Sequence, residues 1–198
     1  IAQGEPNLWD LDAVRRYKKE AHRWGIQIPS LAGVWSPGVS IRTSPVAGIQ
    51  LMKAIRAAEL LGKEAGLLMA SGTMSNLVAA LTHCQRGDEI VMGDQAHMFW
   101  NESGGQAALA GAQTRLVPND AQGGISPEDV ARAIRPKGNP HFPTTTMFCL
   151  ENTHNRCSGM VMTPADTKAV CDVAHAAGVA VHLDGARIFN AAVALEVP

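Results

Sequence analysis

The sequence predicts an α/β domain, in which a mostly parallel sheet has helices on both faces. From about residue 50 onward, short apolar stretches alternate five times with stretches of helical composition. These short stretches are apolar throughout rather than alternately apolar and polar, which is typical of parallel strands buried on both faces. Of the 198 residues, 46% are hydrophobic and 18% are charged, so the chain has enough apolar side chains for a sizeable core.

The apolar stretches predict five strands. Each is short and is bounded by glycine, proline or polar residues, as expected for a buried strand. In chain order, the predicted strands are Gly66–Ala70, Glu89–Met92, Gln113–Val117, Thr146–Leu150 and Val179–Leu183.

Helical composition and end signals predict the helices between these strands. Ser126 and Thr163 each offer a capping hydroxyl directly before a proline, and an acid follows in the first turn, which marks a helix start. Gly178 ends the second of these helices. In the first 50 residues, Trp9–Trp24 predicts a helix, and the prolines beyond it predict irregular chain. The helices predicted after the first 49 residues span 50–61, 71–84, 103–110, 126 onward and 163–177.

Charge, hydropathy and cysteine content exclude several classes of protein. A net charge of −1 and a pI of about 6.7 imply no nucleic acid or other polyanion as partner. No apolar run reaches the roughly 18 residues that span a bilayer, and no secretory leader is apparent, so we expect no membrane partner. The four cysteines have no Cys-x-x-Cys or Cys–His metal-site spacing, so we expect free thiols, no metal and a cytoplasmic protein.

The segment Ser71-Gly72-Thr73 lies at a predicted strand-to-helix junction. A glycine there permits close backbone approach, and the free N–H groups and dipole of a helix N-terminus favour an anion, so the turn can bind phosphate. The alternative is an ordinary serine N-cap, and the segment by itself leaves both interpretations open.

Polar residues follow three other predicted strands. Asp184, with Arg187 three residues later, comes where the chain leaves the last strand, and His154 and His97 follow two earlier strands. Ligands of open α/β sheets bind beyond the carboxyl ends of the strands, where such loops converge. Asp184 and Arg187 are suited to grip a ring nitrogen and a ring oxygen, or they form a structural ion pair. The histidines are either proton-transfer groups or hydrogen-bonded structural residues.

Five motifs, taken in their order along the chain, resemble one known enzyme family. Together they resemble the low-specificity L-threonine aldolases, within the aminotransferase-like (fold type I) superfamily of pyridoxal 5′-phosphate (PLP) enzymes. The resemblance covers residues 57–198, which would be the PLP-binding large domain, and leaves 1–56 as an unmatched, partly irregular segment. The motifs are Ser71-Gly72-Thr73 with Asn76, Gly93-Asp94-Gln95-Ala96-His97, Glu102-Ser103-Gly104-Gly105, Leu150-Glu151-Asn152-Thr153-His154-Asn155, and His182-Leu183-Asp184-Gly185-Ala186-Arg187-Ile188-Phe189-Asn190.

The resemblance implies a PLP cofactor and the residues that bind it. Gly72 and Thr73 would hold its phosphate, and His97 would stack on its pyridine ring. Asp184 would pair with the protonated ring nitrogen, which keeps the ring an electron sink. Arg187 would lie on the side of the ring oxygen.

The resemblance also implies the substrate and the reaction. His154 would face the β-hydroxyl of a small β-hydroxy amino acid and relay its proton, while Glu102 would support the pocket wall. L-Threonine or L-allo-threonine would yield glycine and acetaldehyde, as in glycine biosynthesis and threonine catabolism. Family members assemble as homodimers or homotetramers, so a homo-oligomer is expected.

The sequence departs from the family at both ends. The family's Schiff-base lysine lies in a Ser-Lys-Gly-type motif some tens of residues beyond the position of Arg187, whereas this sequence ends at Pro198. The family's opening Arg-Ser-Asp-Thr-type strand is not found either. We therefore expect a truncated large domain that is inactive alone.

Two other functions remain open at this point. One is β-elimination on an aromatic or sulfur amino acid by the same superfamily. The other is a non-catalytic oligomerisation or binding module that keeps the fold and has lost the lysine. The segment Leu150–Asn155 favours the aldolase over the β-eliminating reaction.

Overall fold

The computed structural model describes residues 58, 63, 66, 67 and 69–197. The predicted helix at Trp9–Trp24 lies outside the described residues, as does the predicted 50–61 helix apart from Ala58, which is helical. Within the described part, no helix is both long and apolar enough to cross a membrane.

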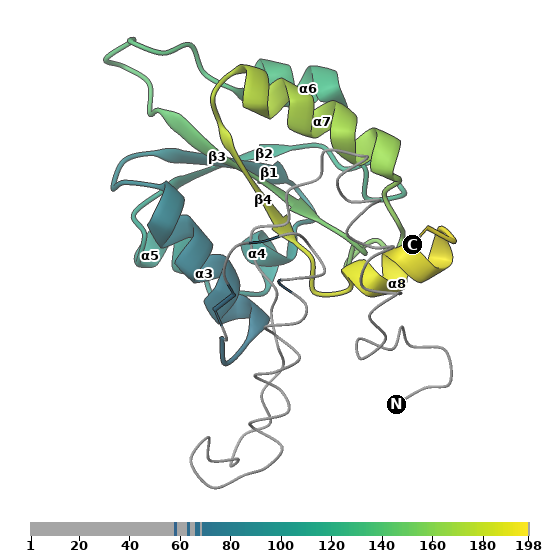
Figure 1. The fold of residues 1–198 in the computed structure, drawn as a ribbon. Coiled ribbons are helices and arrows are strands. Elements are labelled where there is room, and N and C mark those ends of the chain that lie inside the picture. The colour runs from purple at the N-terminus through teal and green to yellow at the C-terminus, as the bar shows by residue number, and fades with distance from the viewer. Residues whose placement is uncertain (1–57, 59–62, 64–65, 68, 198) are drawn as a thin grey trace, which may run out of the picture.

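A four-stranded parallel sheet forms the centre of the described structure (Figure 1). Its strand order is β2-β1-β3-β4, and every neighbouring pair is parallel. The sequence prediction of these strands is confirmed to within one residue at every end. The strands are β1 (Glu89–Gly93), β2 (Gln113–Val117), β3 (Thr145–Glu151) and β4 (Ala180–Asp184).

The predicted first strand, Gly66–Ala70, is wrong for the residues that the structure describes. Gly66, Leu67, Met69 and Ala70 belong to no strand, and the side chain of Leu67 is 68% exposed. A short apolar run stabilises a strand only if its side chains are buried against the sheet. This run instead leads directly into the cap of the next helix, Ser71.

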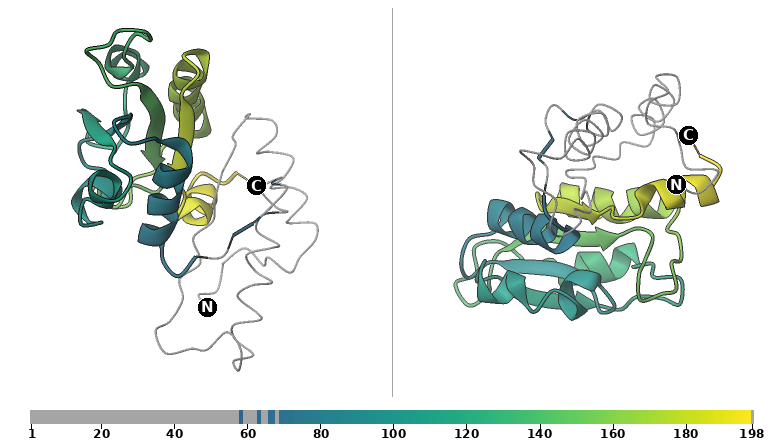
Figure 2. Two further views of the ribbon diagram at one scale, coloured as in Figure 1. Left: turned by 90° about the vertical axis from the view of Figure 1, so that its left-hand side faces the viewer. Right: turned by 90° about the horizontal axis from the view of Figure 1, so that it is seen from below.

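Helices cover both faces of the sheet, as the sequence predicted. The helices α6 and α7 lie together on one face, and α3, α4 and α5 lie on the other (Figures 1 and 2). The hydroxyls of Ser71, Ser126 and Thr163 accept backbone N–H bonds at the starts of α3, α6 and α7, which confirms the predicted caps. The helices are α3 (Gly72–His83), α4 (His97–Trp100), α5 (Gly105–Ala108), α6 (Pro127–Ala133), α7 (Pro164–Ala176) and α8 (Ile188–Ala194).

Alternation along the strands divides the core into two layers. Successive side chains of a strand point to opposite faces of the sheet. In β3, Phe148 and Leu150 therefore pack with the α6 and α7 side, whereas Met147 and Cys149 pack with the α3 side. The same alternation sends Glu151 at the end of β3, and His182 and Asp184 in β4, toward the α3 side.

We expect the substitution Phe148→Ala to lower the free energy of unfolding by about 3–5 kcal/mol, because it leaves a cavity in the core. Phe148 is fully buried between the sheet and the α6 and α7 layer. Leu109→Ala, at a side chain that is 61% exposed, is the control and should change it by less than about 0.5 kcal/mol. Urea titration followed by circular dichroism measures both; equal losses would contradict the assignment of the core.

Candidate active site

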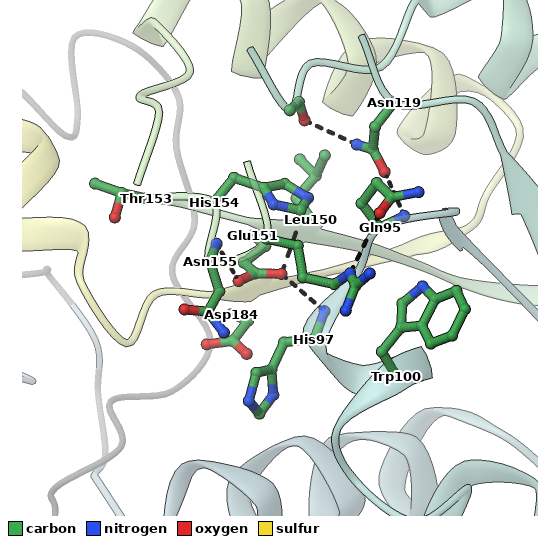
Figure 3. Close-up of polar contacts among 12 residues, drawn as sticks. Gln95, His97, Trp100, Asn119, Leu150, Glu151, Thr153, His154, Asn155 and Asp184 are labelled. Carbon is green, nitrogen blue, oxygen red and sulfur yellow. Dashed lines mark hydrogen bonds and ion pairs between the residues drawn. The ribbon is translucent and has the colours of Figure 1, made fainter. Parts of the chain in front are cut away.

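Polar side chains gather at the carboxyl edge of the sheet, where parallel strands end together. Glu151 ends β3 and Asp184 ends β4, and the two are direct partners in the register of this strand pair. The loop after β1 leads to His97, which begins α4. Figure 3 shows these residues at the edge, together with the loop residues that contact them.

Asp184 is half-buried and accepts hydrogen bonds from neutral donors. Its Oδ2 accepts from Nδ2 of Asn76 (2.8 Å) and its Oδ1 accepts from the backbone N–H of Ala186 (3.2 Å). Within the described residues, no Lys, Arg or His nitrogen forms an ion pair with this carboxylate. A carboxylate held in this way has room for one cationic partner.

Arg187 does not pair with Asp184, so the structural ion pair that the sequence left open is not formed. Its guanidinium donates to the hydroxyl and the carbonyl of Thr153 (both 3.1 Å). It also lies 3.5 Å from Oε1 of Glu151. Arg187 therefore ties the end of β4 to the loop after β3.

Glu102 is buried beside His97 and Asn76. Its Oε1 accepts from Nδ1 of His97 (2.8 Å) and from Nδ2 of Asn76 (2.7 Å). Burial raises the pKa of Glu102, and these two hydrogen bonds and the charge of His97 oppose the shift. The side chain of His97 remains 30% exposed, so its ring is open to a ligand on one side.

His182 lies beneath this group as a fully buried, neutral imidazole. Burial lowers the pKa of His182 to about 4. Its Nε2 is 2.8 Å from Oδ1 of Asn76, and because that oxygen only accepts, Nε2 carries the hydrogen. Nδ1 of His182 has no hydrogen-bond partner among the described residues.

Glu151 joins the loops that surround the edge. Its Oε2 accepts from the backbone N–H of His97 (2.9 Å) and its Oε1 from that of Asn155 (2.8 Å), as the dashed lines in Figure 3 show. With Arg187 as its cationic neighbour, this buried carboxylate fixes the loops after β1, β3 and β4 relative to one another.

His154 is buried on the other side of Glu151. Its Nε2 is 4.0 Å from Oε2 of Glu151, and its Nδ1 has no hydrogen-bond partner among the described residues. Burial lowers the pKa of His154, while the charge of Glu151 opposes the shift. The ring packs so closely on Gly123 that a Cβ at that position would lie 2.7 Å from the side chain of His154.

The N-terminus of α3 presents Gly72 and Thr73. The side chain of Ser71 caps the helix by accepting from the N–H of Met74 (3.1 Å), so the serine N-cap that the sequence suggested is present. The N–H groups of a first helical turn have no partner within the helix. This end of α3 therefore keeps donors that an anion can use.

The structure brings His97, Glu102 and Asp184 together and places His154 and Arg187 around Glu151. Sequence reasoning missed the linking roles of Asn76, Glu151 and His182. The sequence did contain a signal for each residue. Asn76 lies inside a predicted helix, where asparagine is unfavourable. Glu151 is an acid at the end of one apolar strand, and His182 is a histidine inside a second apolar strand. The partners of these residues could not be read from the sequence.

His97, Glu102 and Asp184 have the spacing of a possible metal site. One donor atom each from His97, Glu102 and Asp184 lies within 4.8 Å of the others. The amide nitrogen of Asn76 already donates to both carboxylates. A metal ion bound between these two carboxylates would meet the N–H hydrogens of Asn76, so we assign no metal to the cluster.

Comparison with known proteins identifies the family. Residues 51–198 match the family model described as beta-eliminating lyase. The chain belongs to this family. It is 42% identical over 143 residues to low-specificity L-threonine aldolase 1 of Arabidopsis thaliana, covering 71% of this chain and 40% of that protein. It is 43% identical over 138 residues to the low specificity L-threonine aldolase of Escherichia coli strain K12, covering 70% and 40%.

A solved structure supports the fold. The threonine aldolase of Leishmania major superposes with a TM-score of 0.55 at 21% identity, covering 61% of this chain and 34% of that one. The predicted α/β fold, a parallel sheet with helices on both faces, is thereby confirmed. The chain spans about 40% of the length of the two curated relatives.

We expect Gly123→Ala to destabilise the protein more than Gly138→Ala does. Both glycines have positive φ angles (+79° and +85°), so an alanine at either position costs roughly 1–2 kcal/mol of backbone strain. Only Gly123 would also place its Cβ against His154, which adds about 1–3 kcal/mol of overpacking; the space around Gly138 is open. Thermal and urea unfolding compare the two, and equal losses would contradict the close contact with His154.

We expect His182→Gln to reduce the loss in the free energy of unfolding as the pH falls from about 6.5 to 4. Because the folded pKa of His182 is about 4, below the ordinary value of about 6.5, the unfolded chain takes up a proton first as the pH falls. Stability is therefore fully present above pH 6.5 and is lost between pH 6.5 and 4, by roughly 3 kcal/mol. Glutamine keeps a donor near Nε2 without the titration. Urea unfolding from pH 7 to 4 measures this, and parallel profiles would refute it.

Proposed function

We propose that the chain forms the cofactor-binding part of a PLP-dependent lyase that cleaves L-threonine and L-allo-threonine to glycine and acetaldehyde. The curated relatives at 42% and 43% identity carry the name low-specificity L-threonine aldolase, which supports this reaction. The observation that carries the proposal is Asp184, a half-buried carboxylate without a cationic partner among the described residues, beside the partly exposed ring of His97. Assembly as a homodimer or homotetramer is part of the proposal by family resemblance.

The residues at the carboxyl edge fit PLP in two respects. The cofactor has a phosphate, and the N-terminus of α3 offers Gly72 and Thr73 in a first turn without acidic residues. It also has a pyridine nitrogen that binds a proton, and Asp184 is an anion fixed by Asn76 and Ala186 with capacity for a cation. Gly72 and Thr73 would hold the phosphate, and Asp184 and His97 the ring.

The chemistry of the proposed site depends on a fixed negative charge at Asp184. When bound, the protonated ring supplies an electron sink for the electron pair released as the Cα–Cβ bond of the amino acid breaks. Asp184 would hold the proton on the ring nitrogen by a charge-assisted hydrogen bond, which is roughly twice as strong as a neutral one. His97 is oriented by its side-chain bond to Glu102 and its backbone bond to Glu151. Its ring would stack on the pyridine ring.

His154 is the proposed acceptor for the β-hydroxyl proton of the substrate. Because burial lowers the pKa of His154, its imidazole is neutral near pH 7 and can take up a proton. Glu151, 4.0 Å from Nε2, would stabilise the resulting charge. Arg187 would lie toward the ring oxygen from its position at Thr153, and Glu102 would support the wall of the pocket.

The family description favours β-elimination as a second candidate reaction. The family model that matches residues 51–198 is described as beta-eliminating lyase. The two reactions release different products. Aldol cleavage of threonine gives glycine and acetaldehyde, whereas β-elimination from an aromatic or sulfur amino acid releases the side-chain substituent, as a phenol, an indole or a thiol, together with pyruvate and ammonia. Product analysis of the holoenzyme with each class of substrate decides between them, and pyruvate without acetaldehyde would overturn the aldolase assignment.

We expect Asp184→Asn, made in a holoenzyme that contains this chain as its cofactor-binding part, to lower the rate of threonine cleavage at least about a hundredfold. The substitution keeps size and hydrogen-bonding capacity but removes the charge that holds the ring proton, and each 1.36 kcal/mol of lost transition-state stabilisation costs about tenfold in rate. The melting temperature of the apo-protein should change little. Acetaldehyde release and the PLP dissociation constant are the measurements.

Asp172→Asn is the matched control for this experiment. It removes an equal charge from an exposed i,i+4 pair with Lys168 on α7, and we expect the parental rate. If Asp184→Asn cleaves threonine at the parental rate with full cofactor occupancy, Asp184 does not serve the ring.

A further inference from the structure

The amide of Asn76 uses both of its N–H donors and its carbonyl oxygen at the centre of the site. A side-chain amide offers two N–H donors and an accepting oxygen. Nδ2 of Asn76 donates to Oε1 of Glu102 (2.7 Å) and to Oδ2 of Asp184 (2.8 Å), and Oδ1 accepts from Nε2 of His182 (2.8 Å). Asn76 is only 2% exposed, so few of these contacts can be replaced by bulk water.

The orientation of this amide is fixed by chemistry on both sides. Turning it by 180° would bring its oxygen against two carboxylate oxygens and its NH2 group against the Nε2–H of His182, which loses all three hydrogen bonds. His182 can fix the oxygen of the Asn76 amide because its imidazole is fully buried and neutral, with the hydrogen on Nε2. Asn76 reaches these partners from the middle of α3, four residues after Gly72.

We propose that Asn76 is a positioning residue that holds the carboxylates of Glu102 and Asp184 as a pair in the site, with its own amide oriented by His182. The inference rests on the proposed function, because the pair would flank the cofactor ring: Asp184 toward the ring nitrogen, and Glu102 through His97. Asn76 itself acts through these residues and not by contact with the reacting atoms.

One amide between two carboxylates also links their ionisation. Among the described residues, the ionisable groups near Glu102 are His97 on α4, Asp184 on β4 and the buried thiol of Cys149 on β3. Its two side-chain donors among the described residues, Asn76 and His97, favour the ionised form of Glu102, whereas burial and the charge of Asp184 favour the protonated form. Removing the amide therefore leaves Glu102 with one of the two donors and the full repulsion of Asp184.

A purely structural role for Asn76 predicts something different. If Asn76 only packs α3 against β4, its loss lowers stability without changing the ionisation of Glu102. The test must therefore measure ionisation as well as stability, in the protein without cofactor, so that the result does not depend on the proposed reaction.

The test is a carbon-13 NMR titration of the Glu102 carboxyl in the apo-protein. Asn76→Leu keeps the branching at Cγ and removes all three hydrogen bonds. Because leucine is larger than asparagine, Asn76→Ala is the second variant, should leucine prevent folding. We expect the titration midpoint of Glu102 to rise by roughly one pH unit in either variant. An unchanged midpoint in a folded variant overturns the proposal.

Thr145→Val is the matched control. Thr145 is 4% exposed and its hydroxyl donates to Glu89 (3.1 Å) at the opposite edge of the sheet. This variant also loses a buried hydrogen bond and some stability, but it should leave the midpoint of Glu102 unchanged. An equal shift in Thr145→Val means that general loosening moves the midpoint, and this too overturns the proposal.

A second measurement connects Asn76 to the cofactor. Titration with PLP should show a dissociation constant roughly tenfold higher in Asn76→Leu than in the parent and unchanged in Thr145→Val. Equal affinity of the parent and Asn76→Leu counts against a role toward the cofactor. If the parent itself binds no PLP, the proposed function fails, while the carboxyl titration still decides whether Asn76 holds the pair.

Discussion

The parallel pairing of β3 with β4 decides which side chains can meet at the carboxyl edge of the sheet. Its register sets Glu151 beside Asp184, and the alternation of strand side chains sends both toward the layer that contains α3 and α4. His182, two residues before Asp184, faces the same way and contacts the same asparagine. A one-residue shift in the register of β4 would turn His182 and Asp184 to the other face of the sheet and remove their contacts with Asn76.

Three carboxylates are gathered at this edge, and each is stabilised by a different set of donors. Glu151 accepts two backbone N–H bonds and lies beside Arg187, which suits a residue that fixes loops. Glu102 shares the amide of Asn76 with Asp184 and also accepts from His97. Because buried charges need partners, the donors that surround a carboxylate indicate its role better than its position in the sequence.

Local rules predicted most of the fold and the positions of the site residues, but not their partners. Apolar runs identified β1 to β4, and hydroxyl caps before proline identified α6 and α7, because these signals act between residues close in the chain. The run at Gly66–Ala70 failed because burial against a sheet is a property of the whole fold. Asn76 and Asp184 are 108 residues apart, and the partner of Arg187 is Glu151 rather than its nearer neighbour Asp184. Motif resemblance located these residues without giving such contacts.

Carboxylates at the two ends of the parallel strands have different partners. One is paired with a cation within the fold, whereas the other is not. At the amino end of β1, Glu89 is fully buried and Nε of Arg135 donates to its carboxylate (3.0 Å and 3.1 Å), as do Thr145 and Gln113. That carboxylate has its cation within the fold and needs no ligand. At the carboxyl end of β4, Asp184 is held by two neutral donors, and no cation pairs with it among the described residues. A chain selected for stability alone has no reason to keep a half-buried anion in this state, because an unpaired charge is costly to bury. Under the proposed function, a protonated ring nitrogen would supply this cation, and Asp184 would be the residue that receives it.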